Sequence, residues 1–411
     1  MKSIFQFLFL IFLFPVGVFA QWTQLTSGTT QVLNELIFPA TDTGYVVGDE
    51  GTLLRTTDGG TNWTQLNIST TKNLNDIYFL DSQTGYVVGD SGFFASTVDG
   101  GSSWNSTYLN ASGELNLNSV FFTSVLTGYA GGSVNFTQGI ILKTTDGGIN
   151  WTVTNTPVGS LDINYKRIVF PDPNIGYALS RGMCIKTIDA GSNWFVTDTN
   201  LVNSGGMFSI LEDAYFFSAD TGYIVGWYNP FSGYTVNGGT TWIDQLVLNN
   251  QWYSIDFSSP QTGYMIGWSQ LVKTTDGGQT WWDITSPLIQ LGGIYSMDFT
   301  DDNTGYACGE NGRILKTTNG GITGIESLDF ENKLSVYPNP SNGLVNIKID
   351  KVIFSENESS QVQLLDICGK VVFEHLLREN ESRLEVQLNK GMYFVKIENN
   401  GNAYMEKLVI Q

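Results

Sequence analysis

The chain has 411 residues, of which 41% are hydrophobic and only 14% charged, and it contains 46 glycines. This composition is typical of a β-rich globular protein with many turns. The formal net charge is −19, and the few basic residues leave no basic groove, which argues against nucleic acid or anionic lipid as the partner.

Residues 1–20 have the pattern of a secretion signal. Lys2 provides the charged start, residues 4–14 are apolar, and Val18-Phe19-Ala20 resembles a small-residue cleavage site. A membrane anchor is the alternative, but the apolar run is short for a span and a strand begins at once at Trp22. We therefore predict that the signal is removed and that no transmembrane segment remains.

An eight-residue motif, Thr-x-Asp-x-Gly-x-x-Trp, recurs along the chain from residue 56 onward. Asp or Asn at its third position accepts hydrogen bonds from backbone N–H groups further on, and the glycines adopt positive φ at no steric cost, so the motif predicts a hairpin turn. The tryptophan then opens the next strand and can bury its ring between sheets. We assign a structural role to the third-position residues Asp58, Asp99, Asp146, Asp189, Asn237, Asp276 and Asn319.

A Gly-Tyr strand precedes each motif, and the seven tyrosines follow one another at intervals of 41 to 48 residues. The sequence of each unit predicts four short strands. In the second unit, the predicted strands are 75–80, 85–89, 93–97 and 104–109. Four strands in a repeat of this length describe one blade of a β-propeller, so we predict an all-β, seven-bladed propeller.

The seventh motif lacks its tryptophan, and the start of the chain supplies one. Gln21-Trp22-Thr23-Gln24-Leu25 mirrors Asn62-Trp63-Thr64-Gln65-Leu66, which follows the first motif. We predict that the N-terminal segment is the outer strand of blade seven. This pairing joins the two ends of the ring and leaves no blade incomplete.

These motifs carry a resemblance to a known family. The octet resembles the Asp-box (BNR) repeat, and the whole unit resembles the seven-bladed propeller of photosystem II assembly and stability factors, over residues 21–325. The resemblance implies the fold but not the function, because similar blades occur in sialidases, xyloglucanases and sortilins. The resemblance does not imply a photosynthetic function. That family is linked to a basic patch and a thylakoid setting, whereas this chain is acidic. Sialidase activity needs an arginine triad, and within the predicted propeller only Arg167 and Arg181 lie outside repeat positions.

One face of the predicted propeller is a candidate binding surface. The residue four positions after each Gly-Tyr tyrosine lies on this face and gives an acidic arc in blades seven, one and two and an aromatic arc in blades five and six. An insertion at 227–234 and the pair Trp252-Tyr253 add further rings. Exposed aromatic residues of this density suit stacking on sugars or gripping a peptide. The predicted ligand-binding residues are Asp49, Asp90, Arg181, Trp227, Tyr228, Phe231, Trp252, Trp268 and Glu310.

Both groups of residues also have a purely structural explanation. The aromatic rings can pack between blades, and the acidic residues can stabilise hairpin turns. Two function classes remain. The first, which we favour, is a non-catalytic binding or interaction module for an unknown glycan or protein. The second is an extracellular glycoside hydrolase, which needs two carboxyl groups about 5–9.5 Å apart; Asp49 with Asp90, or Asp49 with Glu310, are the candidate pairs.

The sequence predicts neither a metal site nor a cofactor. Cys184, Cys308 and Cys368 do not have the spacing of a metal cluster, and the first two lie in blades that are not neighbours, so we expect no disulfide between them. The only histidine is His375, outside the predicted propeller, which excludes Ser-His or Cys-His catalysis there.

The last part of the chain reads as a different domain. After a linker at 326–333, alternating strands and turn glycines at 334–411 predict a small β-sandwich. Tyr337-Pro338-Asn339-Pro340, Gly369-Lys370 and Lys407-Leu408-Val409 resemble the C-terminal sorting domain of the type IX secretion system of Gram-negative bacteria. The resemblance implies recognition by that machinery, export across two membranes, and removal of the tail with release or attachment to surface lipopolysaccharide. An unrelated carbohydrate-binding or adhesive sandwich is the alternative.

Overall fold

The computed structural model describes residues 22–110, 113–157, 163–197, 210–227, 231–245, 251–321, 334–349, 360–366, 370–377, 379, 381–399 and 402–411. The predicted signal segment lies outside these residues. The chain divides into two compact units, Met1–Thr323 and Gly324–Gln411, which we describe separately. Within the described ranges, no helix has the length and apolar character needed to cross a bilayer.

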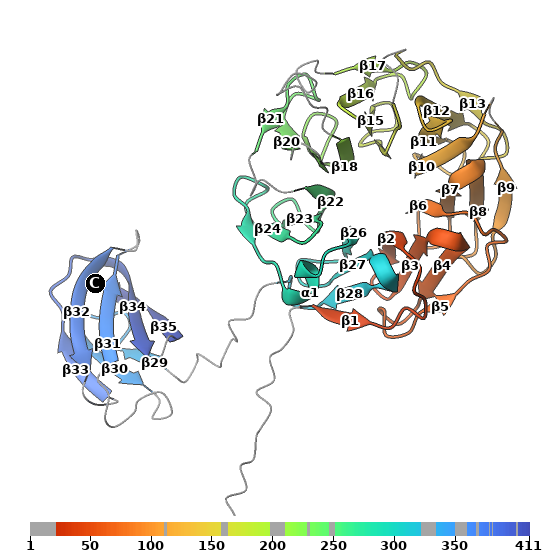
Figure 1. The fold of residues 1–411 in the computed structure, drawn as a ribbon. Helices are drawn as coiled ribbons and strands as arrows, with labels where there is room; N and C mark the ends of the chain where they lie inside the picture. Colours follow the sequence, from red (N-terminus) through yellow and green to blue (C-terminus); the bar gives the residue numbers. More distant parts are fainter. Residues whose placement is uncertain are drawn as a thin grey trace, which may run out of the picture. The chain divides into compact units, whose positions relative to one another are not determined.

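The first unit contains seven antiparallel four-stranded sheets, which Figure 1 shows arranged in a ring. Blades one to three consist of β2 (Leu33–Ala40), β3 (Thr43–Gly48), β4 (Thr52–Thr56) and β5 (Thr64–Gln65); β6 (Leu74–Phe79), β7 (Gly85–Gly89), β8 (Phe93–Thr97) and β9 (Asn105–Tyr108); and β10 (Leu115–Phe122), β11 (Gly128–Val134), β12 (Gln138–Thr144) and β13 (Thr152–Val153). The strands predicted for unit two agree with β6 to β9 to within one residue at each end.

Blades four to seven repeat this order, with the innermost strand first. They consist of β14 (Arg167–Val169), β15 (Gly176–Ser180), β16 (Met183–Thr187) and β17 (Phe195–Val196); β18 (Ile210–Phe216), β19 (Gly222–Trp227), β20 (Phe231–Thr235) and β21 (Ile243–Asp244); β22 (Trp252–Phe257), β23 (Gly263–Gly267), β24 (Leu271–Thr274) and β25 (Trp282–Asp283); and β26 (Ile294–Phe299), β27 (Gly305–Gly309), β28 (Ile314–Thr317) and β1 (Thr23–Leu25). A short helix, α1 (Pro287–Gln290), precedes β26, and 3-10 turns cover Asp49–Gly51, Asp90–Gly92 and Glu310–Gly312.

The N-terminal strand completes blade seven, as predicted. β1 pairs with β28, with Thr23 opposite Lys316 and Leu25 opposite Ile314. The fully buried Trp22 ring meets the Phe299 ring edge-on at 6.0 Å. In blade one, the motif tryptophan Trp63 meets Phe38 with the same geometry. Trp22 therefore takes the place of the tryptophan that the seventh motif lacks.

Aromatic stacking joins neighbouring blades. The Gly-Tyr tyrosine of each blade stacks on a phenylalanine at or near the end of the inner strand of the next blade; the ring centroids of Tyr86 and Phe122 are 3.4 Å apart. The pair Tyr306–Phe38, at 3.7 Å, makes the same contact between blades seven and one. The glycine before the tyrosine leaves room for its own blade's phenylalanine, because a Cβ atom at Gly128 would lie 2.5 Å from the Phe122 ring.

The octet forms a hydrogen-bonded turn. In blade three, Asp146 Oδ1 accepts hydrogen bonds from Thr144 Oγ1 (2.8 Å) and from the Asn150 backbone N–H (2.9 Å). Hydrogen bonds from Asn150 lower the pKa of Asp146. The buried Thr144 Oγ1 in turn accepts from the N–H of Gly148 at 2.9 Å. The motif threonine and aspartate therefore satisfy backbone donors that the tight turn leaves without strand partners.

We expect Thr144→Val to lower the free energy of unfolding of the propeller by about 1–3 kcal/mol, because the isosteric methyl cannot accept the buried backbone N–H bonds. The neighbouring Thr145 is exposed, so Thr145→Val serves as the matched control and should change stability by less than about 0.5 kcal/mol. Urea unfolding followed by tryptophan fluorescence measures both. Equal effects of the two substitutions would contradict a stabilising role of the motif threonine.

The second unit is a small two-sheet domain. β29 (Leu334–Tyr337), β30 (Leu344–Ile349) and β33 (Glu381–Glu385) form one sheet, and β31 (Ser360–Leu365), β32 (Val371–Leu377), β34 (Gly391–Asn399) and β35 (Asn402–Ile410) form the other. Val336 and Ile347 from the first sheet share one core with Val362 and Val395 from the second. The predicted β-sandwich is confirmed.

Candidate functional site

The three acids of the predicted binding face are held by residues of the innermost strands. Asn34 Nδ2 donates to Asp49 Oδ1 at 3.1 Å, and Asn75 Nδ2 donates to Asp90 Oδ1 at 3.0 Å. In blade seven, the Tyr295 hydroxyl lies 2.8 Å from Glu310 Oε1. Each acid therefore contacts the channel-facing side chain of its own blade.

These channel-facing side chains surround a cavity of about 310 Å³, which we call the mouth. The residues at the equivalent position in the seven blades are Asn34, Asn75, Asn118, Lys166, Glu212, Tyr253 and Tyr295, and all of them line the mouth together with Trp227. The asparagines also tie neighbouring blades together, since Asn34 Nδ2 donates to the Leu74 carbonyl at 2.9 Å.

Trp227, Tyr253 and Tyr295 line the mouth, and Trp268 packs against the last two; we call these four rings the aromatic cluster. The Tyr253 ring centroid lies 6.3 Å from Trp227, 6.5 Å from Trp268 and 5.8 Å from Tyr295. The indole Nε1 of Trp227 donates to Glu212 Oε1 at 2.5 Å. Trp268 is 43% exposed. The structure thus brings the predicted Trp227 and Trp268 together and adds Tyr295, which the sequence reasoning missed.

The prediction of a surface role for Trp252 is wrong. Trp252 is only 1% exposed and packs in the core between blades five and six. Successive side chains of a strand point to opposite faces, so within β22 Trp252 enters the core whereas Tyr253 faces the mouth. Arg181 is exposed and follows β15.

Two predicted ligand-binding residues cannot be placed in the site. Tyr228 lies outside the described residues, and Phe231 begins β20 but its side chain is not described.

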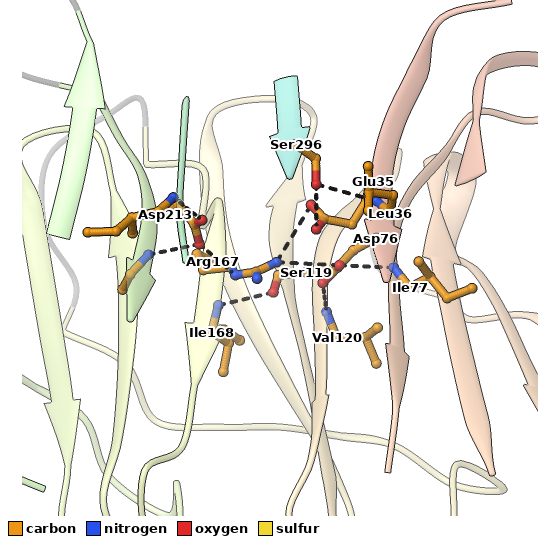
Figure 2. A network of polar contacts seen from close by, with 12 residues as sticks. Glu35, Leu36, Asp76, Ile77, Ser119, Val120, Arg167, Ile168, Asp213 and Ser296 are labelled. Carbon is orange, nitrogen blue, oxygen red and sulfur yellow. Dashed lines mark hydrogen bonds and ion pairs between the residues drawn. The ribbon is translucent and has the colours of Figure 1, made fainter. Parts of the chain in front are cut away.

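A charged layer crosses the channel below the mouth. Arg167 of β14 forms ion pairs with Glu35, Asp76 and Asp213, at 3.7, 3.5 and 2.9 Å. Figure 2 shows the guanidinium extended between these carboxylates, which come from three different blades. Burial lowers the pKa of Arg167, but the surrounding carboxylates, Asp213 foremost, outweigh it and raise the pKa above its usual value. We call these four residues the charged layer.

The carboxylates of the charged layer also brace neighbouring blades. Asp76 Oδ2 accepts the backbone N–H of Val120 at 2.7 Å, and Asp213 Oδ2 accepts that of Ile255 at 2.9 Å. Serines at the equivalent position do the same in other blades; Ser119 Oγ, labelled in Figure 2, accepts from the Ile168 N–H at 3.0 Å. These hydrogen bonds join blade two to blade three, blade three to blade four and blade five to blade six, so Asp76 and Asp213 have a structural role.

A second cavity, of about 340 Å³, lies against the charged layer and is also lined by Asp256 and Asp298. Asp298 Oδ2 accepts the Phe38 N–H at 2.6 Å across the junction of blades seven and one. Burial raises the pKa of Glu35 to about 8 and that of Asp256 to about 6. Burial, with the nearby Asp256 carboxylate, raises the pKa of Asp298 to about 8.

These shifts predict that the propeller becomes less stable as the pH rises from about 5 to about 8.5. A carboxyl group with a higher pKa in the folded state stabilises the fold below its unfolded pKa, and this contribution disappears as the pH rises through the folded value. Glu35→Gln and Asp298→Asn should each flatten the decline of Tm with pH. Asp42→Asn, which removes an exposed acid on the octet side of blade one, is the control. A wild-type Tm that rises over this interval would contradict the prediction.

Metal-ligating groups and thiols are two kinds of reactive side chain in the described part of the chain. No three His, Cys, Asp or Glu side chains among the described residues are arranged to hold a metal ion. Cys184 and Cys308 are buried free thiols, and burial raises the pKa of each. Cys368 lies outside the described residues.

Sequence reasoning missed the charged layer. Its signal is a charged residue at the third position of inner strands that are otherwise rich in apolar residues, as in Leu33-Asn34-Glu35-Leu36 and Leu74-Asn75-Asp76-Ile77. Aligning the seven inner strands by their terminal phenylalanines would have placed Glu35, Asp76, Arg167 and Asp213 at one level of the channel.

Seven four-stranded antiparallel sheets arranged in a ring define this protein as a seven-bladed β-propeller. The family model of the photosynthesis system II assembly factor YCF48 matches residues 61–194 and 241–344. The match covers more than half of the chain, and the chain belongs to this family. The model of the secretion system C-terminal sorting domain matches residues 335–411, which indicates export by the type IX system.

Solved structures of other propellers share the fold. YCF48 bound to a D1 peptide is 19% identical, with a TM-score of 0.58 over 73% of this chain and 97% of that chain. YCF48 from Cyanidioschyzon merolae is also 19% identical, with a TM-score of 0.57 over 72% and 98%. A catalytically inactive virginiamycin B lyase from Staphylococcus aureus, with quinupristin, is 9% identical, with a TM-score of 0.59 over 72% and 98%. A search of curated protein sequences found no match.

Proposed function

We propose that this chain is an exported, non-catalytic binding module that grips a segment of a partner protein at the mouth of its propeller. The observation that carries this proposal is the aromatic cluster, which places four rings beside a cavity of about 310 Å³. Aromatic residues at such positions dominate the binding energy of protein interfaces. Within the family, YCF48 in complex with a D1 peptide is an example of a propeller that holds a peptide.

The exposure of Trp268 supports a ligand rather than a packing role for the cluster. Motif tryptophans that pack between blades are largely covered; Trp194, for example, is only 5% exposed. Trp268 is 43% exposed, although its ring contacts those of Tyr253 and Tyr295. A large apolar ring left in solvent beside a cavity is typical of a binding site.

The sorting domain supports an extracellular location for this module. We propose that a signal at residues 1–20 takes the chain across the inner membrane and that residues 334–411 engage the type IX machinery. Removal of the tail then leaves the propeller secreted or attached to the cell surface.

A glycoside-hydrolase function is not proposed, because each candidate carboxylate is held by a neighbouring side chain. Asp49, Asp90 and Glu310 contact Asn34, Asn75 and Tyr295, respectively. The carboxylates of the charged layer pair with Arg167 and brace the blades. Fixed partners of this kind favour turns and blade junctions over acid–base chemistry.

Panning a random dodecapeptide phage library against the purified full chain tests the proposal. We expect enriched peptides whose binding weakens at least tenfold in Trp268→Ala and is unchanged in Trp282→Ala. Trp282 is a matched control, since it is 49% exposed on the outer strand of blade six. The absence of any Trp268-dependent peptide, or binding to a glycan array in its place, would overturn the proposal of a protein ligand.

A further inference from the structure

We propose that the mouth recognises a positively charged side chain, lysine or arginine, of the partner segment, held between the aromatic cluster and the carboxylates of Glu212 and Glu310. This inference rests on the proposed function, because it specifies the chemistry of the ligand at the same site. It is carried by the pairing of rings with carboxylates, by the charge of the mouth and by its size.

The rings of the cluster are suited to a cation. A lysine or arginine group within about 6 Å of a ring centroid is attracted to the negative π face, most strongly by tryptophan. Two of the rings also donate a hydrogen bond to a carboxylate: Trp227 Nε1 to Glu212 at 2.5 Å and the Tyr295 hydroxyl to Glu310 at 2.8 Å. A donor that is bound to an anion polarises its ring toward greater electron density, which strengthens the attraction for a cation.

The same carboxylates provide direct partners for the ligand. An ionised carboxylate has about four acceptor positions, and each ring donor uses one of them. Lysine and arginine carry several N–H donors that form short, charge-assisted bonds with such oxygens. Glu212 lines the mouth, and Glu310 adjoins it through Tyr295, so the mouth offers a cation two carboxylates, each beside an aromatic ring.

The charge of the mouth favours a cation over an anion. Two bases, Lys166 and Arg167, line the cavity, and Arg167 is already paired with three carboxylates. Burial raises the pKa of Glu35 to about 8, so it adds little charge at neutral pH. The other acids that line the cavity or contact its lining residues are Asp49, Asp76, Asp90, Glu212, Asp213 and Glu310. An acidic cleft attracts a basic ligand and repels an acidic one.

The size of the mouth limits the ligand to side chains rather than a folded domain. The cavity of about 310 Å³ ends at the charged layer, whose Glu35, Arg167 and Asp213 form part of its lining. A cation that enters from the open face therefore stops at the level of Lys166 and Glu212. The rest of the partner segment lies over the rim.

Lys166 is a cation of the protein itself that lines the mouth and would compete with a cationic ligand for Glu212. Burial raises the pKa of Glu212, and the charge of Lys166, which lines the same mouth, offsets part of this rise. Lys166 therefore lies close enough to Glu212 to offset part of the negative charge that a ligand would meet. Removing this charge should strengthen the binding of a cationic ligand, an effect that a merely structural role of Lys166 would not produce.

Two phage libraries, identical except that one lacks lysine and arginine, separate this inference from the proposed function. We expect Trp268-dependent binders from the complete library and none from the depleted one. Trp268-dependent binders from both libraries would overturn the inference but leave the peptide-binding function standing. Binders from neither library would overturn both.

Titration of the best cationic peptide against defined variants tests the roles of the residues. Glu212→Gln and Glu310→Gln keep an acceptor for the ring donors but remove the charge, and each should weaken binding about tenfold, or by about 1.4 kcal/mol. Lys166→Met should strengthen it several-fold. Asp42→Asn removes the same charge on the octet side and should leave binding unchanged. An equal effect of Asp42→Asn, or weaker binding by Lys166→Met with its fold intact by circular dichroism, would contradict the assignment.

Discussion

Replacing Arg167 by methionine is expected to lower the free energy of unfolding of the propeller by about 3–5 kcal/mol. The guanidinium pairs with Glu35, Asp76 and Asp213 inside the channel. Without it, Asp76 and Asp213 lose their cationic partner in a partly buried site, and the cost of leaving them unpaired acts on the hydrogen bonds that they make to the next blade. Chemical denaturation at pH 7 measures the loss.

The pH dependence of the same variant distinguishes charge from packing. Lowering the pH toward 5 should restore part of the stability of Arg167→Met, because the unpaired carboxyl groups take up protons more readily when folded. Arg181→Met is the matched control, since this exposed arginine lies outside the charged layer, and its effect should stay within about 0.5 kcal/mol. If Arg167→Met is as stable as the wild type at pH 7, the positive charge of Arg167 does not contribute to the stability of the propeller.

Replacing Trp22 by alanine is expected to cost about 3–5 kcal/mol, the range found when a large buried ring is removed. Trp22 is fully buried and shares a core with Ile284, Leu315 and Phe299 of blades six and seven. Its loss leaves a cavity at the point where β1 pairs with β28. We expect both a lower Tm of the propeller and faster amide exchange in β1 and β28.

Trp282→Ala provides the comparison for this second prediction as well. Trp282 lies on β25 and is 49% exposed, so its removal should leave stability within about 0.5 kcal/mol of the wild type. If the two alanine variants unfold at the same denaturant concentration, the N-terminal strand contributes little to blade seven.

The sequence was sufficient to predict the fold because its repeats are local. The Gly-Tyr strand and the octet recur in every blade, and both have a physical role that can be read from one copy: room for a phenylalanine ring beside Gly128 and a tight turn around Asp146. The terminal strand was predictable for the same reason, since Trp22 repeats the sequence context of Trp63.

The candidate site was only partly predictable because it depends on the direction of single side chains. Trp252 and Tyr253 are adjacent in sequence, yet one is in the core and the other in the mouth. The prediction chose Trp252 for its large aromatic ring, whereas the alternation of side chains along β22 places Tyr253 in the mouth. Tyr295 escaped notice because it lies in an inner strand, 27 positions from Trp268, and only the curvature of the ring brings the two together.

The pairing of β1 with β28 also sets the order in which the molecule can be completed. Thr23 and Lys316 are 293 positions apart in the chain, whereas the four strands of every other blade follow one another directly. The first strand must therefore wait until the last blade has been synthesised. Because the entropy of closing a loop grows only slowly with its length, this delay costs folding time rather than final stability. In a truncated chain that ends before β28, β1 has no strand to pair with. The pairing of β1 with β28 therefore forms only in a chain that contains all seven blades.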